Sequence, residues 1–217
     1  FSTDLGALSS LEYGITKNLE MGVINGSTIS NLSPATFYFV KGIASDGSTD
    51  IGLFSTQSNS TGSIQVFFNH QPNNNFSDIA DAQYVNFENK IIELINEAEA
   101  TLDICVFYTK SKKIGEAINN ANNRGVIVRF IAGSSSLGDF PKNLDEGIST
   151  LKREEPKGQM HNKFIVADVD STTKCKVLIT SANFTENNLE EDSNNLLIIQ
   201  DQALGKAYTI EFEEMWG

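Results

Sequence analysis

Strand patterns and helix patterns alternate along the chain from about residue 64 onward. The expected segments are, in order, a strand at 64–68, a helix at 86–99, a strand at 102–108, a helix at about 112–123 and a strand at 126–131. In the first helix, apolar side chains recur on one face, and Arg124-Gly125 is a typical C-terminal stop for the second helix. Strands separated by helices of this length predict βαβ crossovers, and therefore an α/β domain with helices on both faces of a mixed sheet.

The N-terminal part of the chain has a different pattern. Short apolar stretches are separated by Ser, Thr, Gly and Asn up to about residue 60, which is typical of a small all-β sandwich. In 29–39 a proline turn directly precedes an alternating aromatic strand. This segment resembles part of a fibronectin type III domain, and the resemblance implies that the copy is incomplete at its N-terminal end. A polar connector at Gln57–Gly62 then predicts two domains, at 1–61 and 62–217.

Composition and charge narrow the classes of function. The net charge of -12 disfavours non-specific binding of long nucleic acids, so a phosphate-bearing ligand would need a local pocket. No apolar run approaches the roughly 20 residues that cross a bilayer, so we expect no transmembrane segment. Cys105 and Cys175 lie in strand-like segments and are predicted to be buried free thiols. The only histidines, His70 and His161, are too few for a His-rich zinc site.

The most informative stretch is His161-Asn162-Lys163, which leads into an apolar strand that ends at Asp168. Residues two apart in an extended segment share one face, so His161 and Lys163 are expected to project together. A returning strand at 177–180 would deliver Ser181 and Asn183 beside them. An imidazole, an ammonium, a hydroxyl and an amide then converge, and this set suits a phosphate: imidazole can attack phosphorus while the others bind its oxygens.

The pattern H-x-K-x4-D, followed after a strand by S-x-N, resembles the HKD signature of the phospholipase D superfamily. The resemblance covers roughly 62–217. It implies that His161 is the nucleophile that forms a phosphohistidine, and that Lys163 and Asn183 grip the phosphoryl oxygens. Asp168 belongs to the catalytic motif on its supporting side, and Ser181 helps to order the site. No metal and no cofactor are expected.

Three departures from the usual family pattern bear on activity. Thr180 stands where the family usually has glycine before the serine, and a β-branched residue narrows the approach of a phosphate to the backbone. The hairpin segment Val169–Ile179 is longer than usual. A carboxylate that is common near Asn194-Asn195 is also absent.

The chain contains one HKD motif, whereas enzymes of this family build an active site from two. One histidine attacks phosphorus, and the other protonates the leaving alcohol and then activates water. His70 lacks the accompanying Lys and Asp and is expected in a loop at a strand end. The second half is therefore expected from a homodimer partner or from a segment beyond Gly217 of a longer two-motif protein.

The leading hypothesis is therefore a phosphodiesterase of the phospholipase D type. Its substrate would be a phospholipid or a nucleic acid, and the sequence does not decide between these two. The alternative is a non-catalytic binding or scaffold protein with a degenerate phospholipase D-like half, a hypothesis that Thr180 and the single motif favour. Fibronectin-type modules beside catalytic domains imply an exported protein, so a secreted or extracytoplasmic location is expected.

Overall fold

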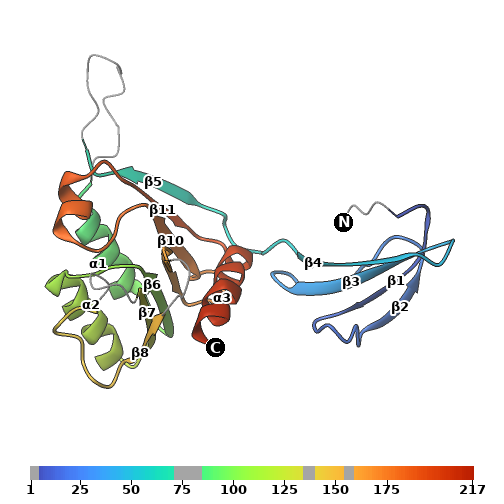
Figure 1. The fold of residues 1–217 in the computed structure, drawn as a ribbon, viewed down its shortest axis with the longest axis horizontal. Coiled ribbons are helices and arrows are strands. Elements are labelled where there is room, and N and C mark those ends of the chain that lie inside the picture. The colour runs from blue at the N-terminus through green and yellow to red at the C-terminus, as the bar shows by residue number, and fades with distance from the viewer. Residues whose placement is uncertain (1–4, 71–84, 134–139, 154–158) are drawn as a thin grey trace, which may run out of the picture. The chain divides into compact units, whose positions relative to one another are not determined.

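The computed structural model describes residues 5–70, 85–133, 140–153 and 159–217. The chain forms two compact units, Phe1–Asn59 and Ser60–Gly217 (Figure 1).

The N-terminal unit is an antiparallel sheet of four strands in the order β2-β1-β3-β4. The strands are β1 (Leu8–Gly14), β2 (Gly22–Asn25), β3 (Phe37–Ala44) and β4 (Thr49–Ser55). Leu11, Tyr38 and Val40 form a small core on one face of the sheet. The all-β prediction is confirmed. The described residues of this unit form a single sheet, so the fibronectin type III resemblance stays a prediction.

The second unit contains a mixed sheet of seven strands in the order β5-β11-β10-β9-β6-β7-β8. Its strands are β5 (Ile64–Phe68), β6 (Thr101–Val106), β7 (Ile127–Gly133), β8 (Ser149–Arg153), β9 (Lys163–Ala167), β10 (Lys176–Thr180) and β11 (Asn195–Ile199). The pairs β6-β7 and β7-β8 are parallel and the remaining pairs are antiparallel. The predicted α/β class with a mixed sheet is confirmed.

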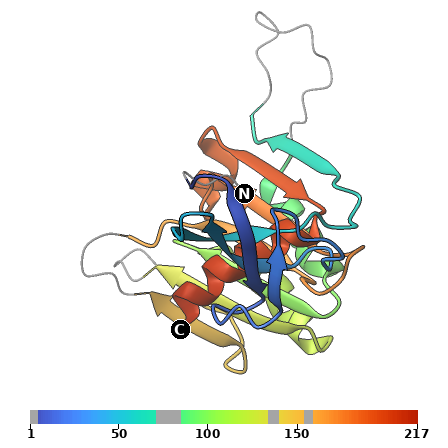
Figure 2. The same cartoon turned by 90° about the vertical axis from the view of Figure 1, so that its right-hand side faces the viewer.

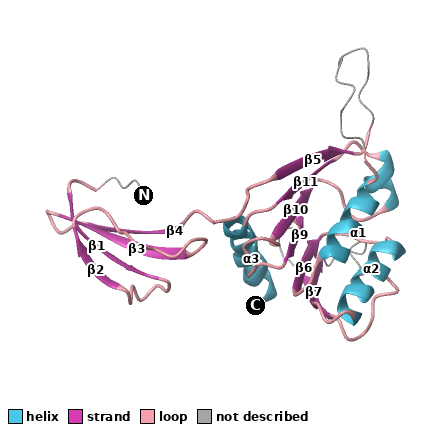
Figure 3. Cartoon of the chain, turned by 180° about the vertical axis from the view of Figure 1, so that it is seen from behind, coloured by secondary structure: helices cyan, strands magenta, loops and turns pink. Residues whose placement is uncertain are grey.

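Helices cover both faces of this sheet, as predicted. Helices α1 (Phe87–Glu97) and α2 (Lys112–Asn123) lie on one face, and α3 (Gln202–Trp216) lies on the other (Figure 3). Figure 2 shows α3, in red, lying across the strands. Each of these three α-helices begins after a residue whose side chain accepts a backbone N–H of the first turn, namely Asn86, Ser111 and Asp201. A short π-helix, η1 (Asn187–Glu191), has no such cap. The two faces enclose separate apolar cores, because alternate strand residues point to opposite sides.

An ionic cluster fixes α3 to the sheet. Arg129 of β7 makes two hydrogen bonds of 2.7 Å to the carboxylate of Asp103, its neighbour on β6, and contacts Glu213 of α3 at 2.7 Å. Its guanidinium also lies over the rings of Phe212 and Trp216, with centroids at 4.7 and 5.5 Å. The bonds to Asp103 and Glu213 hold the pKa of Arg129 above its usual range, although burial opposes them. The charge of this arginine is therefore retained under the helix.

Candidate functional site

Strands β6, β9, β10 and β11 each have one end on the side of the sheet that carries the HKD motif. This side, formed by the ends of these strands, is called the motif edge of the sheet. Lys163, the first residue of β9, pairs with Val106, the last residue of β6. Thr180, the last residue of β10, pairs with Leu196 near the start of β11. Because β9 is antiparallel to both β6 and β10, the residues just outside these strands gather at the motif edge. The predicted hairpin of β9 and β10 is thus confirmed.

His161 and Lys163 form one part of the site. His161 is exposed, whereas Lys163 is only 6% exposed and its Nζ donates to the carbonyl oxygen of His161 at 2.8 Å. The ring of Phe107 contacts both: its centroid is 5.3 Å from that of the imidazole and 5.8 Å from Nζ of Lys163. Burial lowers the pKa of the Lys163 ammonium. A cation held in a partly dry position interacts more strongly with a phosphate than one in bulk water.

The segment Phe107–Ser111 connects this part of the site with Asn183. At one end, the N–H of Phe107 donates to the carbonyl oxygen of Asn162, between His161 and Lys163, at 3.1 Å. Further along, Tyr108 accepts from the N–H of Phe184 at 3.0 Å, and Lys110 donates to the carbonyl oxygen of Phe184 at 2.9 Å. One short stretch of backbone therefore holds the two halves of the motif. This pairing also explains why β6 ends at Val106, two residues earlier than the pattern predicts.

Asn183 and Ser181 differ in what their side chains do. The Ser181 hydroxyl donates to Oδ1 of Asn194 at 2.7 Å and accepts from the N–H of Asn195 at 3.1 Å. These two bonds join the two ends of the segment that connects β10 to β11. The amide oxygen of Asn183 is buried and has no hydrogen-bond partner among the described residues. Buried polar groups without a partner are uncommon in folded proteins and are often found at binding sites.

The three departures from the family pattern have structural counterparts. The hydroxyl of Thr180 donates to the carbonyl oxygen of Asn195 at 2.7 Å and accepts from the N–H of Ala182 at 3.0 Å, so it turns back into the loop. Asn194, near the position of the missing carboxylate, accepts the Ser181 hydroxyl. The long hairpin is fixed by Gln200, whose amide donates to the carbonyl oxygen of Thr172 at 2.9 Å.

Asn69, at the end of β5, is a site residue that the sequence pattern does not reveal. It is 3% exposed, and its amide nitrogen lies 2.6 Å from the carbonyl oxygen of Asp192, while its oxygen accepts the N–H of Asn194 at 2.9 Å. It therefore supports the segment that follows Asn183. Its neighbour His70 bonds through Nε2 to the carbonyl oxygen of Glu191 at 2.8 Å. β5 lies three strands from β9, roughly 14 Å away, so His70 is remote from His161.

Asp168 lies at the opposite end of β9 from Lys163. Asp168 follows Lys163 by five residue steps along the extended chain, or roughly 16 Å. The carboxylate of Asp168 accepts backbone N–H groups of Glu99, Ala100 and Thr101, with the shortest contact of 2.7 Å to Ala100. Asp168 was predicted as part of the catalytic set, but it is too far away to touch a phosphate bound by Lys163.

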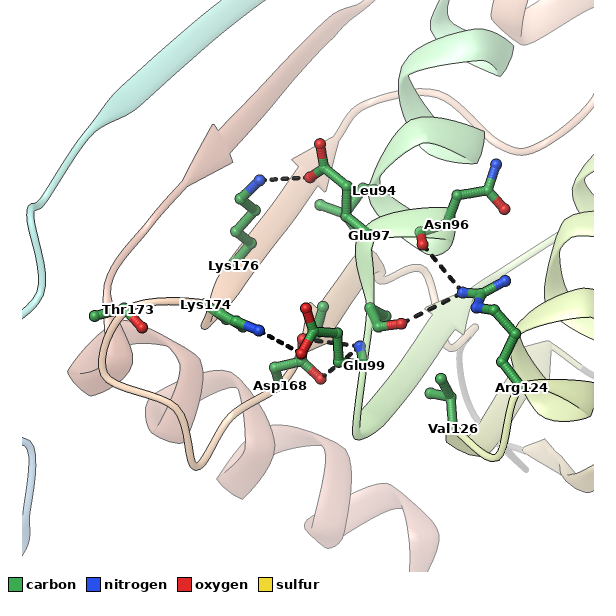
Figure 4. Close-up of a pocket in the computed structure, with 12 residues that line it drawn as sticks. Leu94, Asn96, Glu97, Glu99, Arg124, Val126, Asp168, Thr173, Lys174 and Lys176 are labelled. Carbon is green, nitrogen blue, oxygen red and sulfur yellow. Dashed lines mark hydrogen bonds and ion pairs between the residues drawn. The ribbon is translucent and has the colours of Figure 1, made fainter.

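A cavity of about 590 Å³ adjoins Asp168 on this supporting side (Figure 4). Lys176 pairs with Glu97 at 2.5 Å and Lys174 pairs with Glu99, while Arg124 donates to carbonyl oxygens at the end of α1. The cations that line the cavity are therefore already paired. Neither His161 nor Lys163 lines it.

The two cysteines, the candidate metal ligands and the helices each bear on a prediction from the sequence. Cys105 and Cys175 are buried and free, as predicted, and burial raises the pKa of each to about 12. Within the part of the chain that the structure describes, no three His, Cys, Asp or Glu side chains are grouped as a metal site requires. No helix among the described residues combines the length and apolar character needed to span a bilayer.

Comparison with known proteins identifies the family. A family model described as "Cardiolipin synthase, PLD-like domain" matches residues 91–216. The chain therefore belongs to the phospholipase D-like family. The crystal structure of the phospholipase D family member Nuc from Salmonella typhimurium has the same fold, with a TM-score of 0.55, 18% identity, and coverage of 71% of this chain and 93% of Nuc.

Curated relatives match over the same region. The mitochondrial cardiolipin hydrolase of Homo sapiens is 30% identical over 135 residues, which cover 58% of this chain and 50% of the relative. A phospholipase D of Rickettsia prowazekii (strain Madrid E) is 31% identical over 126 residues, which cover 54% of this chain and 57% of the relative. The chain thus spans about half the length of the curated relatives it matches.

The expected secreted or extracytoplasmic location is wrong. Several of the relatives, including those from Homo sapiens and Canis lupus familiaris, are named mitochondrial cardiolipin hydrolases, and these names contradict the expectation of secretion. The expectation rested on the resemblance to fibronectin type III, which none of these matches supports.

Proposed function

We propose that the second unit is one half of a phosphodiesterase of the phospholipase D type. The observation that carries the proposal is the Phe107–Ser111 segment, whose backbone bonds to Asn162 and Phe184 bring the two parts of the motif to the motif edge of the sheet. An exposed imidazole, a desolvated ammonium and an amide lie at this edge, in His161, Lys163 and Asn183. The alternative of a degenerate scaffold predicts no need for a desolvated lysine beside an exposed histidine.

In the proposed reaction, a nitrogen of His161 attacks phosphorus and forms a P–N bond while the bond from phosphorus to the leaving oxygen breaks. The ammonium of Lys163 and the amide NH2 group of Asn183 donate hydrogen bonds to the non-bridging oxygens, on which negative charge shifts in the transition state. A second histidine gives its proton to the leaving alcohol. It then takes a proton from water, which attacks phosphorus and releases His161.

The second histidine is proposed to come from another HKD half. Either a second copy of this chain supplies it across a two-fold axis, or a segment beyond Gly217 does. His70 is a poor substitute, because its imidazole bonds to the Glu191 carbonyl three strands away from β9. In a homodimer the same surface would be used by both subunits, and the active site would be shared.

Asp168 and Ser181 are proposed to act on the shape of the site. Asp168 joins the end of β9 to the start of β6 through three backbone N–H groups, and so fixes the strand that carries Lys163. Ser181 fixes the turn that carries Asn183 through its two hydrogen bonds. Neither needs to contact phosphate.

The substrate is proposed to be a phosphodiester of a phospholipid or a nucleic acid. Relatives named cardiolipin hydrolase and phospholipase D support the lipid, and the net charge of -12 disfavours long nucleic acids. We also propose that residues 62–217 are the catalytic domain and that 1–61 is a separate fibronectin type III-like module. The compact units support this division.

The proposal is tested by diesterase assays on the purified chain over a dilution series, with light scattering in parallel. The substrates are cardiolipin vesicles, a single-stranded oligonucleotide and bis(p-nitrophenyl) phosphate, each with and without a chelator. We expect turnover that the chelator does not reduce. If a second copy completes the site, turnover should fall as dimers dissociate. If a segment beyond Gly217 completes it, turnover should appear only when that segment is added. Absence of turnover from every assembly, on all three substrates, would refute the enzyme and favour the scaffold.

A further inference from the structure

Glu88 is a buried carboxylate that the proposed mechanism does not use. It is the second residue of α1 and is 9% exposed. One oxygen accepts the hydroxyl of Ser111 at 2.6 Å, and the other accepts Nζ of Lys113 at 2.7 Å. Burial would raise the pKa of Glu88, but these two hydrogen bonds outweigh it and lower the pKa. The group is therefore held as a carboxylate.

Ser111 links Glu88 to the site. Its hydroxyl caps α2 by accepting the N–H of Ile114 at 3.1 Å while it donates to Glu88. Its own backbone N–H donates to the carbonyl oxygen of Phe184 at 3.2 Å, beside the bond from Lys110 to the same oxygen. Phe184 directly follows Asn183. A continuous chain of hydrogen bonds thus runs from α1, through the start of α2, to the residue next to the proposed phosphate ligand.

We propose that Glu88 is a positioning residue for Asn183 and acts through Ser111. This inference rests on the proposed function, because Asn183 matters only if it binds the reacting phosphate. By accepting the hydroxyl proton, Glu88 turns the lone pairs of Ser111 toward Ile114 and fixes the end of the Phe107–Ser111 segment. The segment in turn fixes Phe184, and with it the backbone of Asn183.

The pair with Lys113 does not explain why Glu88 is buried. The side chain of Lys113 is 70% exposed, and an exposed partner contributes little to stability. The cap of α2 also requires only the Ser111 oxygen as acceptor, not a carboxylate behind it. What the carboxylate adds is a fixed direction for the hydroxyl between two helices. A misplacement of about 1 Å in a catalytic group can reduce turnover on the order of 100-fold.

The kinetic test compares Glu88→Ala and Glu88→Gln with the unaltered active assembly, using bis(p-nitrophenyl) phosphate. We expect kcat per folded molecule to fall at least tenfold in Glu88→Ala, with KM changed less than threefold. Glu88→Gln, which still accepts the Ser111 hydroxyl, should recover most of the loss. The matched control is Glu93→Gln, which removes an exposed carboxylate of the same helix that pairs with Lys90 at 2.6 Å. This control should leave kcat unchanged, and a kcat of Glu88→Ala within threefold of the unaltered protein would overturn the proposal.

Amide hydrogen exchange tests the same chain of bonds without relying on activity. The amides of Lys110 and Phe184 should exchange at least tenfold faster in Glu88→Ala, while that of Leu178 in β10 should not change. Unchanged exchange at Lys110 and Phe184 refutes the positioning role, whether or not the protein turns over substrate. Faster exchange in a chain that shows no turnover in any assembly, with or without the downstream segment, refutes the proposed function instead, and leaves Glu88 as a support of the Asn183 backbone.

Discussion

Replacing Asp168 should unfold the second unit more easily without changing its chemistry. In Asp168→Ala, the backbone N–H groups of Glu99, Ala100 and Thr101 lose their shared acceptor. The residue also has φ of 52°, in the left-handed region, which alanine tolerates less well than Asp or Asn. Both effects act on the junction between β9 and β6.

The magnitude follows from these bonds. A buried donor left unsatisfied costs roughly 1–3 kcal/mol. The three N–H groups are only partly buried, so water replaces the lost acceptor in part and each lost bond should cost roughly 1 kcal/mol. With roughly 1 kcal/mol for the backbone conformation, we expect Asp168→Ala to lower the free energy of unfolding by about 4 kcal/mol. Asp168→Asn keeps one acceptor oxygen and tolerates the left-handed conformation, so about 2 kcal/mol is expected.

The assay is denaturant unfolding followed by the fluorescence of Trp216, the chain's only tryptophan, which lies in α3 and therefore reports on the second unit. Asp170→Ala, an exposed carboxylate of the same hairpin, is the matched control and should stay within about 0.5 kcal/mol. A loss below about 1 kcal/mol for Asp168→Ala would refute the reasoning. So would a fall of more than 100-fold in the turnover of folded Asp168→Asn, because a carboxylate that only supports the strand should leave the chemistry of the folded protein nearly unchanged.

Three further predictions concern the lysine, the ionic cluster and the thiols. Lys163→Met should reduce turnover roughly 100-fold or more and raise the melting temperature at pH 7. Burial lowers the pKa of the Lys163 ammonium in the folded protein, so the unfolded chain binds the ammonium proton more tightly. The free energy of unfolding should therefore rise with pH up to the ordinary lysine pKa of about 10.4. The stability gained by Lys163→Met should shrink at that pH, because Lys163 is then neutral. Asp103→Ala should cost about 3 kcal/mol in Trp216-monitored unfolding, because it leaves Arg129 partly unpaired beneath α3; a cost below 1 kcal/mol would contradict this. Cys105 and Cys175, whose pKa burial raises to about 12, should react with a thiol reagent at pH 8 only on unfolding, and rapid labelling of the native protein would be inconsistent with their environment.

Features of the fold that depend on local patterns could be predicted from the sequence. The range 112–123 predicted for α2 matches the structure, because an amphipathic pattern lies between a serine cap and Arg124-Gly125. The hairpin of β9 and β10 was likewise predicted, since two apolar runs flank a polar turn. β8 was not predicted, because Ser149–Arg153 has no apolar run and its pairing with β7 is a long-range contact.

Site residues could also be predicted where they belong to a local pattern and not where they act through long-range contacts. His161, Lys163, Ser181 and Asn183 could be picked out by their spacing along the chain. Asn69 could not, because it acts on Asp192 and Asn194, more than 120 residues away in the sequence. Glu88 likewise acts on a residue of the next helix. The position of Asp168 in the motif suggested a catalytic role, whereas the length of β9 determines that it lies at the far end of the strand.

The most direct test of the central claim is the identification of the residue that becomes phosphorylated. An active assembly would be mixed with a slow phosphodiester substrate, quenched rapidly in alkaline denaturant and analysed by peptide mass spectrometry. The quench is alkaline because a phosphorus–nitrogen bond to histidine survives better there than in acid. We expect a phosphoryl adduct on His161, with no adduct and no turnover in His161→Ala. An adduct on another side chain, or undiminished turnover by His161→Ala, would contradict it.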